Sequence, residues 1–331
     1  MPENRLHVHS LRPLANADQL MELLDPRIAL TEGDEVSVPP RATQVLVGGR
    51  PSHGDLEACS ELRMLVVPYA GIPEATRELM LQFPRIAVHN LHHNASAAAE
   101  LALALFLAAA KRVIPADRGL RSGDWSIRYA DGGDLQLEGK TVLILGLGAV
   151  GSQIGRVCEA LGLRVIGVKR HPEFPPPATE SFEVHGPEDL QEILPKADAL
   201  IVSLPLTPST RGLLDEEALR RLPRHAVLVN VARGPIIEEE ALFDALSTGQ
   251  IAAAGLDVWY QYPRAEEEKT ETYPSSFPFQ ELDNVVLSPH RGGAFNRPDL
   301  ERLRIEHLAE LLNAAARGAQ VPNRVDVEAG Y

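Results

Sequence analysis

The sequence feature that most constrains the fold is a glycine-rich turn near the middle of the chain. Residues 146–151 read Gly-Leu-Gly-Ala-Val-Gly, and they stand between a predicted strand, Val142–Leu145, and a predicted helix, Val150–Leu161. In such a strand–turn–helix unit the first glycine, Gly146, permits the tight turn, and Gly148 lets a pyrophosphate approach the backbone. The third glycine, Gly151, lets the helix pack on the strand. The pattern predicts a dinucleotide site, with Ala149 and Val150 at the helix end that faces the phosphates.

Short apolar segments alternate with helical patterns along the rest of the chain, and this alternation predicts parallel sheets covered on both faces. The first set of predicted strands is Leu6–Val8, Gln44–Val47, Met64–Val67 and Arg85–Val88. The second set is Val142–Leu145, Arg164–Val168, Ala199–Leu204, Ala226–Asn230, Ala252–Asp257 and Asn284–Leu287. The predicted helices are Ala17–Leu24, Pro73–Leu81, Ala95–Val113, Val150–Leu161, Asp215–Leu222, Glu238–Ala245 and Leu300–Ala316. We therefore expect two doubly wound α/β domains, one made of residues 1–99 and 292–331 and the other of residues 100–291.

The composition narrows the class of protein. The net charge of −14 argues against nucleic acid or an anionic membrane as a partner. Residues 1–30 lack the basic start and apolar core of a signal peptide, and the apolar run Ala95–Ala110 is too short to span a bilayer. Cys59 and Cys158 are expected to be reduced core thiols. Together these features favour a cytoplasmic protein.

The end of the second predicted strand bears on the choice of cofactor. NAD-binding proteins usually place an acid there, which bonds the ribose hydroxyls. In this chain the position is Lys169, and Arg170 follows it. Two cations favour the 2′-phosphate of NADP(H). We therefore expect NADP(H) as the cofactor, and NAD(H) is the alternative. The alternative is that both side chains are solvated residues at a strand end.

The later segments carry a resemblance to the D-isomer-specific 2-hydroxyacid dehydrogenases, of the glyoxylate/hydroxypyruvate reductase or phosphoglycerate dehydrogenase type. The matching segments are Leu137–Thr141, Ser203–Pro208, Asn230–Pro235, Ala254–Val258 and Ser288–Gly293. The resemblance implies a flavodoxin-like substrate domain and a Rossmann cofactor domain. It also implies an NAD(P)-dependent oxidoreductase that acts on the CH–OH group of a small 2-hydroxyacid.

The resemblance implies roles for single residues in the cofactor domain. Arg233 would anchor the substrate carboxylate and polarise the neighbouring carbonyl, since a guanidinium binds a carboxylate through a planar fork. His290 would give or take the proton, because imidazole titrates near neutral pH. Asp257 would bond the nicotinamide amide, with a strand-end cap as the alternative. Further residues expected at the cofactor are Leu204, Pro205, Thr207 and Ala232.

The resemblance also assigns residues near the start of the chain to the substrate. The loop Tyr69-Ala70-Gly71 matches one whose backbone amides hold the substrate carboxylate, and glycine there allows close approach. Asn94 matches a polar residue on the other wall of the cleft. His89, His92 and His93 permit a metal site, but no acidic or cysteine partner is near them in sequence, so no metal is expected. One of these histidines is expected to shape the substrate preference instead.

One position departs from the family pattern. The family places a glutamate five residues after the aspartate, where it pairs with the catalytic histidine, and here the residue is Tyr262. A tyrosine can orient the imidazole by a hydrogen bond but adds no negative charge at neutral pH. A carboxylate from residues 266–271 could replace the glutamate, although a solvated charged loop is the stronger expectation.

Two alternative functions stay open because of this departure. One is a hydride transfer without a proton relay, as in formate dehydrogenases. The other is a regulatory protein that binds NAD(P)H and turns over poorly.

The oligomeric state is suggested by two segments. The Ala/Leu-rich helix Ala95–Val113 is apolar on most of its circumference, which indicates burial between domains or subunits. The polar loop 123–139 carries Trp125 and Tyr129, as an arm that reaches a partner subunit would. We expect a homodimer.

Overall fold

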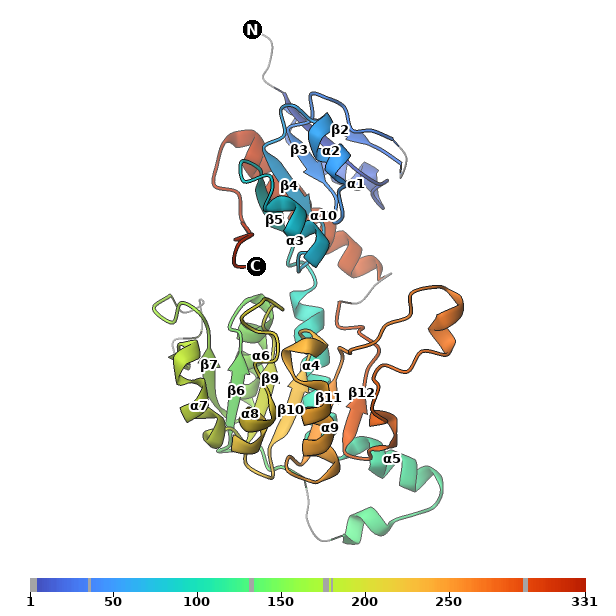
Figure 1. Ribbon diagram of the computed structural model, residues 1–331, viewed down its shortest axis with the longest axis vertical. Helices are drawn as coiled ribbons and strands as arrows, with labels where there is room; N and C mark the ends of the chain where they lie inside the picture. Colours follow the sequence, from blue (N-terminus) through green and yellow to red (C-terminus); the bar gives the residue numbers. More distant parts are fainter. Residues whose placement is uncertain (1–4, 35–36, 131–133, 175–178, 180, 294–296) are drawn as a thin grey trace. The chain divides into compact units, whose positions relative to one another are not determined.

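The structure is a computed structural model that describes residues 5–34, 37–130, 134–174, 179, 181–293 and 297–331. It divides into two compact units (Figure 1). The first unit is Met1–Asn94 with Ala294–Tyr331, and the second is Ala95–Gly293. The domain boundaries predicted from the sequence lie between residues 99 and 100 and between residues 291 and 292. The first boundary lies earlier because helix α4 (Ala95–Ala110) is one continuous element, and its residues from Ala99 to Ala110 pack in the core of the second unit.

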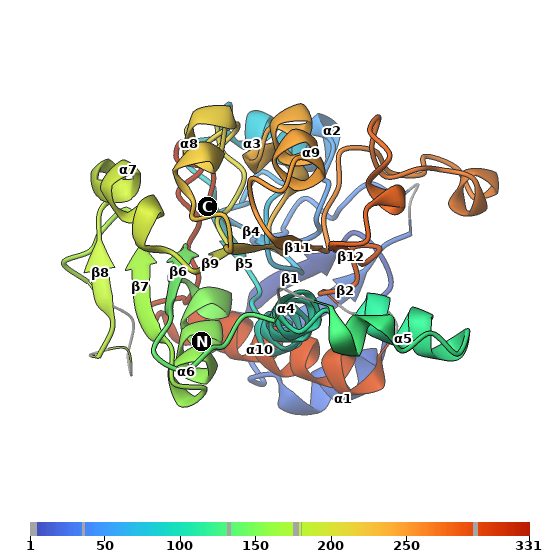
Figure 2. The ribbon, with the colours of Figure 1, turned by 90° about the horizontal axis from the view of Figure 1, so that it is seen from below.

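The first unit contains, within the described residues, a sheet of parallel strands in the order β2-β1-β3-β4-β5. The strands are β1 (Leu6–Ser10), β2 (Ile28–Glu32), β3 (Val45–Val47), β4 (Met64–Val67) and β5 (Ala87–Asn90). Helices α1 (Ala17–Leu23) and α10 (Pro298–Arg317) cover one face, and α2 (His53–Ala58) and α3 (Glu74–Met80) cover the other (Figure 2). Successive residues of a strand point to opposite faces, so Val45 and Val47 join one apolar core and Leu46 joins the other. This strand order is the flavodoxin-like one.

The second unit contains a parallel sheet in the order β12-β11-β10-β9-β6-β7-β8. Its strands are β6 (Thr141–Leu145), β7 (Arg164–Val168), β8 (Glu183–His185), β9 (Ala199–Val202), β10 (Val227–Asn230), β11 (Ala253–Leu256) and β12 (Val285–Leu287). Helices α4 and α6 (Ala149–Ala160) pack on one face. Helices α7 (Leu190–Ile193), α8 (Glu216–Arg221) and α9 (Glu239–Ser247) pack on the other (Figure 2). This is the Rossmann order: the chain adds strands outward from β6, first through β7 and β8 on one side and then from β9 to β12 on the other.

The expected fold of two doubly wound parallel sheets is confirmed, and the differences in detail have local causes. Strands β2 and β8 and helices α2 and α7 were not predicted: β8, α2 and α7 are short, and β2 has only one buried residue, so its apolar pattern is weak. The strand predicted at Arg85–Val88 lies at Ala87–Asn90. The long helix predicted to reach Val113 ends at Ala110, because Arg112 takes the left-handed conformation with φ of 49° and the chain starts a new helix, α5 (Val113–Arg121).

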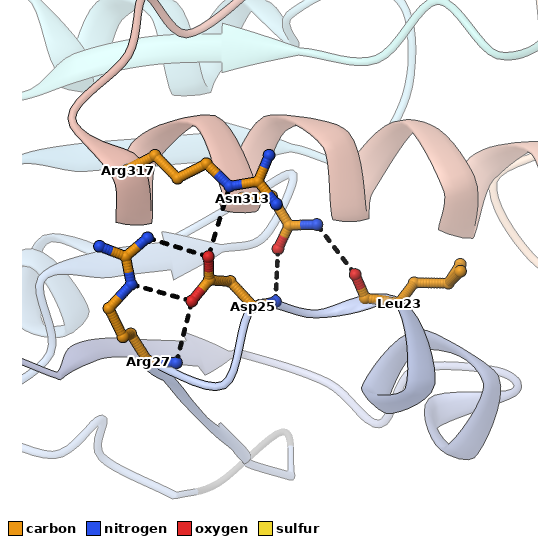
Figure 3. Close-up of polar contacts among 5 residues, drawn as sticks. All are labelled: Leu23, Asp25, Arg27, Asn313 and Arg317. Atoms are coloured by element: carbon orange, nitrogen blue, oxygen red, sulfur yellow. Dashed lines mark hydrogen bonds and ion pairs between the residues drawn. The ribbon is translucent and has the colours of Figure 1, made fainter.

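The C-terminal helix packs in the apolar core of the first unit, and a polar cluster at its end adds a second tie (Figure 3). The Asn313 side-chain oxygen accepts from the Asp25 backbone N–H at 2.7 Å, and its amide nitrogen donates to the Leu23 carbonyl at 2.9 Å. The Asp25 carboxylate accepts from both Arg27 at 2.9 Å and Arg317 at 3.4 Å. These bonds tie the turn between α1 and β2 to a helix that follows almost 300 residues later. None of the helices in the described residues combines the length and the apolar character that a bilayer crossing requires.

Candidate active site

In the glycine turn between β6 and α6, two glycines leave no room for a side chain and the third faces open space. Gly146 has a φ of 95°, and a Cβ there would lie 3.0 Å from the Ser203 carbonyl. A Cβ on Gly151 would lie 1.9 Å from the Gly146 carbonyl oxygen, so only glycine fits against the turn. A Cβ on Gly148, in contrast, would meet no described atom within 4 Å. The open side at Gly148 is where a phosphate group can approach the backbone.

The residues around this turn fit a dinucleotide. Helix α6 begins at Ala149 directly after Gly148, so the N–H groups of its first turn, Val150 included, point out of the helix end with no capping side chain. Across the turn, the Ser203 hydroxyl donates to the Gly146 carbonyl at 2.7 Å and fixes it to the end of β9. Leu204 and Pro205 follow β9 and are partly buried. The Thr207 hydroxyl is within 3.0 Å of Ser209 and 3.1 Å of Thr210, so it stabilises this second turn.

The end of strand β7 carries the two predicted cations. The Lys169 backbone N–H bonds the His185 carbonyl at 3.0 Å, and its ammonium donates to the Phe174 carbonyl at 2.5 Å. Arg170 is exposed. The ammonium of Lys169 is thus held near the backbone by one bond and keeps donors for an anion.

The turn after β10 presents Arg233. The buried Asn230 side chain spans this turn: its nitrogen donates to the Arg233 carbonyl at 3.1 Å, and its oxygen accepts from the Ala232 N–H at 3.0 Å. A Cβ on Gly234 would lie 2.3 Å from the Trp259 carbonyl oxygen, so the turn packs closely on the next loop. Arg233 itself is exposed, and its guanidinium donates to the Ala232 carbonyl at 2.6 Å. The sequence identified Arg233 but not the role of Asn230 as its support.

Asp257, after β11, is buried and organises the loop that carries the histidine. Its carboxylate accepts from the Ser288 hydroxyl at 2.5 Å and from the backbone N–H groups of Arg291 and Gly292 at 2.8 Å. His290 lies inside this loop with a φ of 53°, in the left-handed region that a non-glycine residue rarely adopts. Three charge-assisted bonds to one carboxylate explain how this backbone is held.

His290 contacts Tyr262 by an aromatic contact, with ring centroids 5.5 Å apart and planes at 57°. The tyrosine hydroxyl accepts from the Trp259 backbone N–H at 3.0 Å. Burial lowers the pKa of His290, the positive charge of Arg233 lowers it further, and Asp257 opposes them. The acidic residues of the 266–271 loop are exposed, and two of them have local partners: Glu266 pairs with Lys269, and Glu268 accepts from the Arg264 N–H. Asp257 is therefore the acid that acts on His290 within this unit.

Trp259 is a site residue that the sequence reasoning missed. It is buried, its indole N–H donates to the Ser288 carbonyl at 2.8 Å, and its ring packs on Phe279 at 6.0 Å. It therefore anchors the loop of His290 from a second side. A tryptophan two residues after Asp257, at the start of a long polar loop, was the available signal.

The first unit holds the remaining predicted residues. Tyr69, Ala70 and Gly71 follow β4, and Gly71 has a φ of 48°. Burial raises the pKa of Tyr69, while Arg50 and Arg12 lower it, so two guanidinium groups that the sequence reasoning did not identify lie near this loop. Asn94 is the last residue of the unit before α4.

The histidines after β5 have neighbours in the same unit. The His89 ring bonds the Pro322 carbonyl at 2.7 Å. Burial lowers the pKa of His93 to about 4, helped by Arg304, His307 and His92. Among the described residues, no group of three or more histidine, cysteine, aspartate or glutamate side chains is arranged to hold a metal ion.

Comparison with known proteins identifies the family. Residues 103–292, more than half of the chain, match the family model of the D-isomer specific 2-hydroxyacid dehydrogenase, NAD binding domain. The chain belongs to this family. The predicted resemblance is confirmed, and Arg233, Asp257 and His290 all lie in the matched range.

Relatives of the family are similar over much of the chain. A D-3-phosphoglycerate dehydrogenase of Methanocaldococcus jannaschii is 30% identical over 272 residues, which cover 82% of this chain and 49% of the relative. A glyoxylate reductase of Aeropyrum pernix is 38% identical over 241 residues, which cover 70% of this chain and 67% of the relative. The chain thus spans about half the length of the phosphoglycerate dehydrogenase.

Solved structures share the whole architecture. The D-isomer specific 2-hydroxyacid dehydrogenase of Xanthobacter autotrophicus Py2, crystallised with NADPH and MES, has 26% sequence identity and a TM-score of 0.79 over 99% of this chain and 100% of that chain. The NADPH-dependent glyoxylate/hydroxypyruvate reductase SmGhrA of Sinorhizobium meliloti has 20% identity and a TM-score of 0.78, over 99% of this chain and 100% of that one, and shares the fold.

Proposed function

We propose that this family member catalyses reversible hydride transfer between NAD(P)H and a small 2-oxoacid, such as glyoxylate or hydroxypyruvate. The observation that carries the proposal is the order β10-β11-β12 in the sheet of the second unit. Because these parallel strands are neighbours, Arg233, Asp257 and His290 all leave the sheet at its carboxyl edge, where α/β proteins bind ligands. The glyoxylate reductase relative supports the choice of substrate class.

The residues of this unit have separate tasks in the proposed reaction. The guanidinium of Arg233 binds the substrate carboxylate and polarises the C2 carbonyl. His290 gives a proton to the carbonyl oxygen in reduction and takes it back from the hydroxyl in oxidation. The nicotinamide, when bound, would supply the hydride in reduction and accept it in oxidation. Asp257 holds the loop of His290, and its Oδ2, which accepts from the Gly292 N–H, keeps capacity for the nicotinamide amide.

The proposed cofactor is NADP(H), with NAD(H) as the second choice. Gly148 leaves space beside the N-terminus of α6 for the pyrophosphate. Lys169 and Arg170 stand where an NAD-specific site would have an acid. The relative of Xanthobacter autotrophicus Py2 was crystallised with NADPH, which supports this preference.

We further propose that the first unit is the substrate domain and the second the cofactor domain. The backbone amides of Ala70 and Gly71 in the Tyr69 loop would bind the substrate carboxylate, and Asn94 would contact the substrate. These roles follow from the family resemblance of the segments.

We also propose a cytoplasmic homodimer. Helix α5 and the segment after it expose several apolar side chains: Val113, Ile114, Leu120, Trp125 and Tyr129. A cavity of about 890 Å³ in the same unit is lined partly by apolar residues, among them Pro115, Leu135, Leu246 and Val286. A second copy of the chain would bury such surface, which a monomer would leave in water.

The experiment that tests the proposal measures consumption of NADPH and NADH with a panel of 2-oxoacids, with formate oxidation in parallel. We expect turnover of a small 2-oxoacid and a preference for NADPH. Formate oxidation alone would favour transfer without a proton relay. Tight NADPH binding with no turnover of any 2-oxoacid would favour the regulatory alternative.

A further inference from the structure

The surroundings of His290 differ from those of a histidine paired with a glutamate. In the second unit, the groups that face it are the ring of Tyr262, the guanidinium of Arg233 and the carboxylate of Asp257. Asp257 already accepts three hydrogen bonds from the loop around His290. Within the described part of this unit, no side chain hydrogen-bonds the His290 ring nitrogens. Among the described residues of this unit, the charged groups that act on His290 are thus the Arg233 guanidinium and the Asp257 carboxylate, which already accepts hydrogen bonds.

Trp259 fixes this arrangement from both sides. Its backbone N–H donates to the Tyr262 hydroxyl at 3.0 Å, which places the phenol ring. Its indole N–H donates to the Ser288 carbonyl at 2.8 Å, which places the loop of His290. Because Trp259 holds both Tyr262 and the loop of His290, hydrogen bonds fix the contact between the two rings.

We propose that Tyr262, by placing an uncharged side chain where a carboxylate would stand, leaves His290 an uncharged base, so that the site withdraws the proton of a 2-hydroxyacid down to a lower pH than a glutamate-paired site would. This inference rests on the proposed function and specifies the working form of its proton-transfer residue. A neutral ring in place of a carboxylate removes the main attraction for an imidazolium, and Arg233 repels it. The attraction of a cation for the phenol face is weaker than that of a full negative charge.

The proton balance of the oxidation follows directly. The neutral imidazole takes the proton of the C2 hydroxyl, and the C2–H bond breaks with both electrons as a hydride to the NAD(P)⁺ of the proposed function. The C2–O bond becomes a carbonyl, and the imidazolium returns its proton to solvent. The reverse reaction needs His290 charged beforehand, so it fails as the pH rises through the His290 pKa.

The first test measures the titration of His290 by NMR on the full chain with isotope-labelled histidine and no cofactor. A His290→Gln spectrum assigns the signal among the 11 histidines. We expect a wild-type midpoint below the ordinary value of about 6.5. Tyr262→Glu should raise the midpoint by about 1 to 3, whereas Tyr262→Gln and Tyr262→Phe should leave it low. Tyr273→Glu is the matched control, because Tyr273 is exposed on the same loop and should have no effect.

The second test compares pH profiles of kcat/KM in both directions, with the 2-oxoacid that turns over best and its 2-hydroxyacid. In Tyr262→Glu, the pH at which reduction falls by half should rise by the same amount as the NMR midpoint. A mere loss of packing would lower the rates without moving this pH.

The outcomes separate the inference from the proposed function. A wild-type midpoint at or above 6.5, or an unchanged midpoint in Tyr262→Glu, overturns the inference. If Tyr262→Glu does not fold, the wild-type midpoint decides alone. Expected midpoints with no turnover of any 2-oxoacid would instead reject the proposed function and leave the protonation state established.

Discussion

At the scale of single residues, the proposed reactive groups are held by neighbours that do no chemistry themselves. Asn230 spans the turn of Arg233, and Asp257 and Trp259 hold the loop of His290 from two sides. Each of these three is buried, and a buried polar group is stable only with hydrogen-bond partners. Most of their partners are backbone atoms of the turns, so satisfying them also fixes the positions from which Arg233 and His290 project.

Replacing Arg233 should show whether it binds the substrate. Because its guanidinium would serve both binding and carbonyl polarisation, Arg233→Ala should raise KM and lower kcat together, with a loss in kcat of about 100-fold. Steady-state kinetics with the best 2-oxoacid measure this, with Arg221→Ala as the control, since Arg221 pairs with Glu217 on helix α8. Unchanged kinetics would remove Arg233 from the site.

Replacing the cations after β7 should show which cofactor the chain prefers. Lys169→Ala with Arg170→Ala should weaken NADPH binding about 10-fold or more and leave NADH binding nearly unchanged, because only NADPH carries the 2′-phosphate. Cofactor fluorescence titrations give both dissociation constants, with the exposed Lys196→Ala as the control. An equal loss for the two cofactors would argue against the phosphate contact.

At the scale of elements, a charged cluster adds to the apolar contacts that place α10 on the sheet of the first unit (Figure 3). Bonds from Arg27 and Arg317 hold the pKa of the Asp25 carboxyl well below its usual range. A carboxyl with a lowered pKa in the folded state stabilises it above the unfolded pKa, near 4, and loses this stabilisation as the pH falls toward the folded pKa. The melting temperature of the wild type should therefore be higher than that of Asp25→Asn at pH 7. This difference in melting temperature, the gap, should shrink below about pH 4.

Thermal unfolding of both proteins between pH 3 and 7 measures this gap. Glu22→Gln, at an exposed position of helix α1, controls for the loss of one negative charge. A gap that stays constant over the whole range would show that the Asp25 charge contributes nothing.

At the scale of the whole molecule, the exposed apolar side chains around α5 favour association with a second copy of the chain. Trp125 is 57% exposed, and a large apolar side chain in water costs free energy that association recovers. Trp125→Asp should shift the protein from dimer toward monomer in sedimentation velocity. Phe174→Asp is the control, because Phe174 is as exposed but lies on the loop after β7. A wild-type protein that sediments as a monomer would contradict the proposed dimer.

Much of the fold and of the site was predictable because the signals are local. The glycine turn needs only its own residues and one strand and one helix beside it, so Gly146, Gly148 and Gly151 were identified directly. The charge at Lys169 and the missing carboxylate at Tyr262 are visible one position at a time. Strands β2 and β8 were missed because their pairing with β1 and β7 supplies a stability that their own residues do not show.

The sequence by itself determined the fold class, the family and the identity of the candidate residues, because periodicity and motif spacing are properties of neighbouring positions. Only the tertiary structure decided what those residues touch. That Asp257 bonds Ser288 across 31 positions, and that Trp259 holds both Tyr262 and the loop of His290, depends on loops from different strands meeting at one sheet edge. Such contacts form when the whole sheet assembles and its buried polar groups find partners, and no local pattern records them.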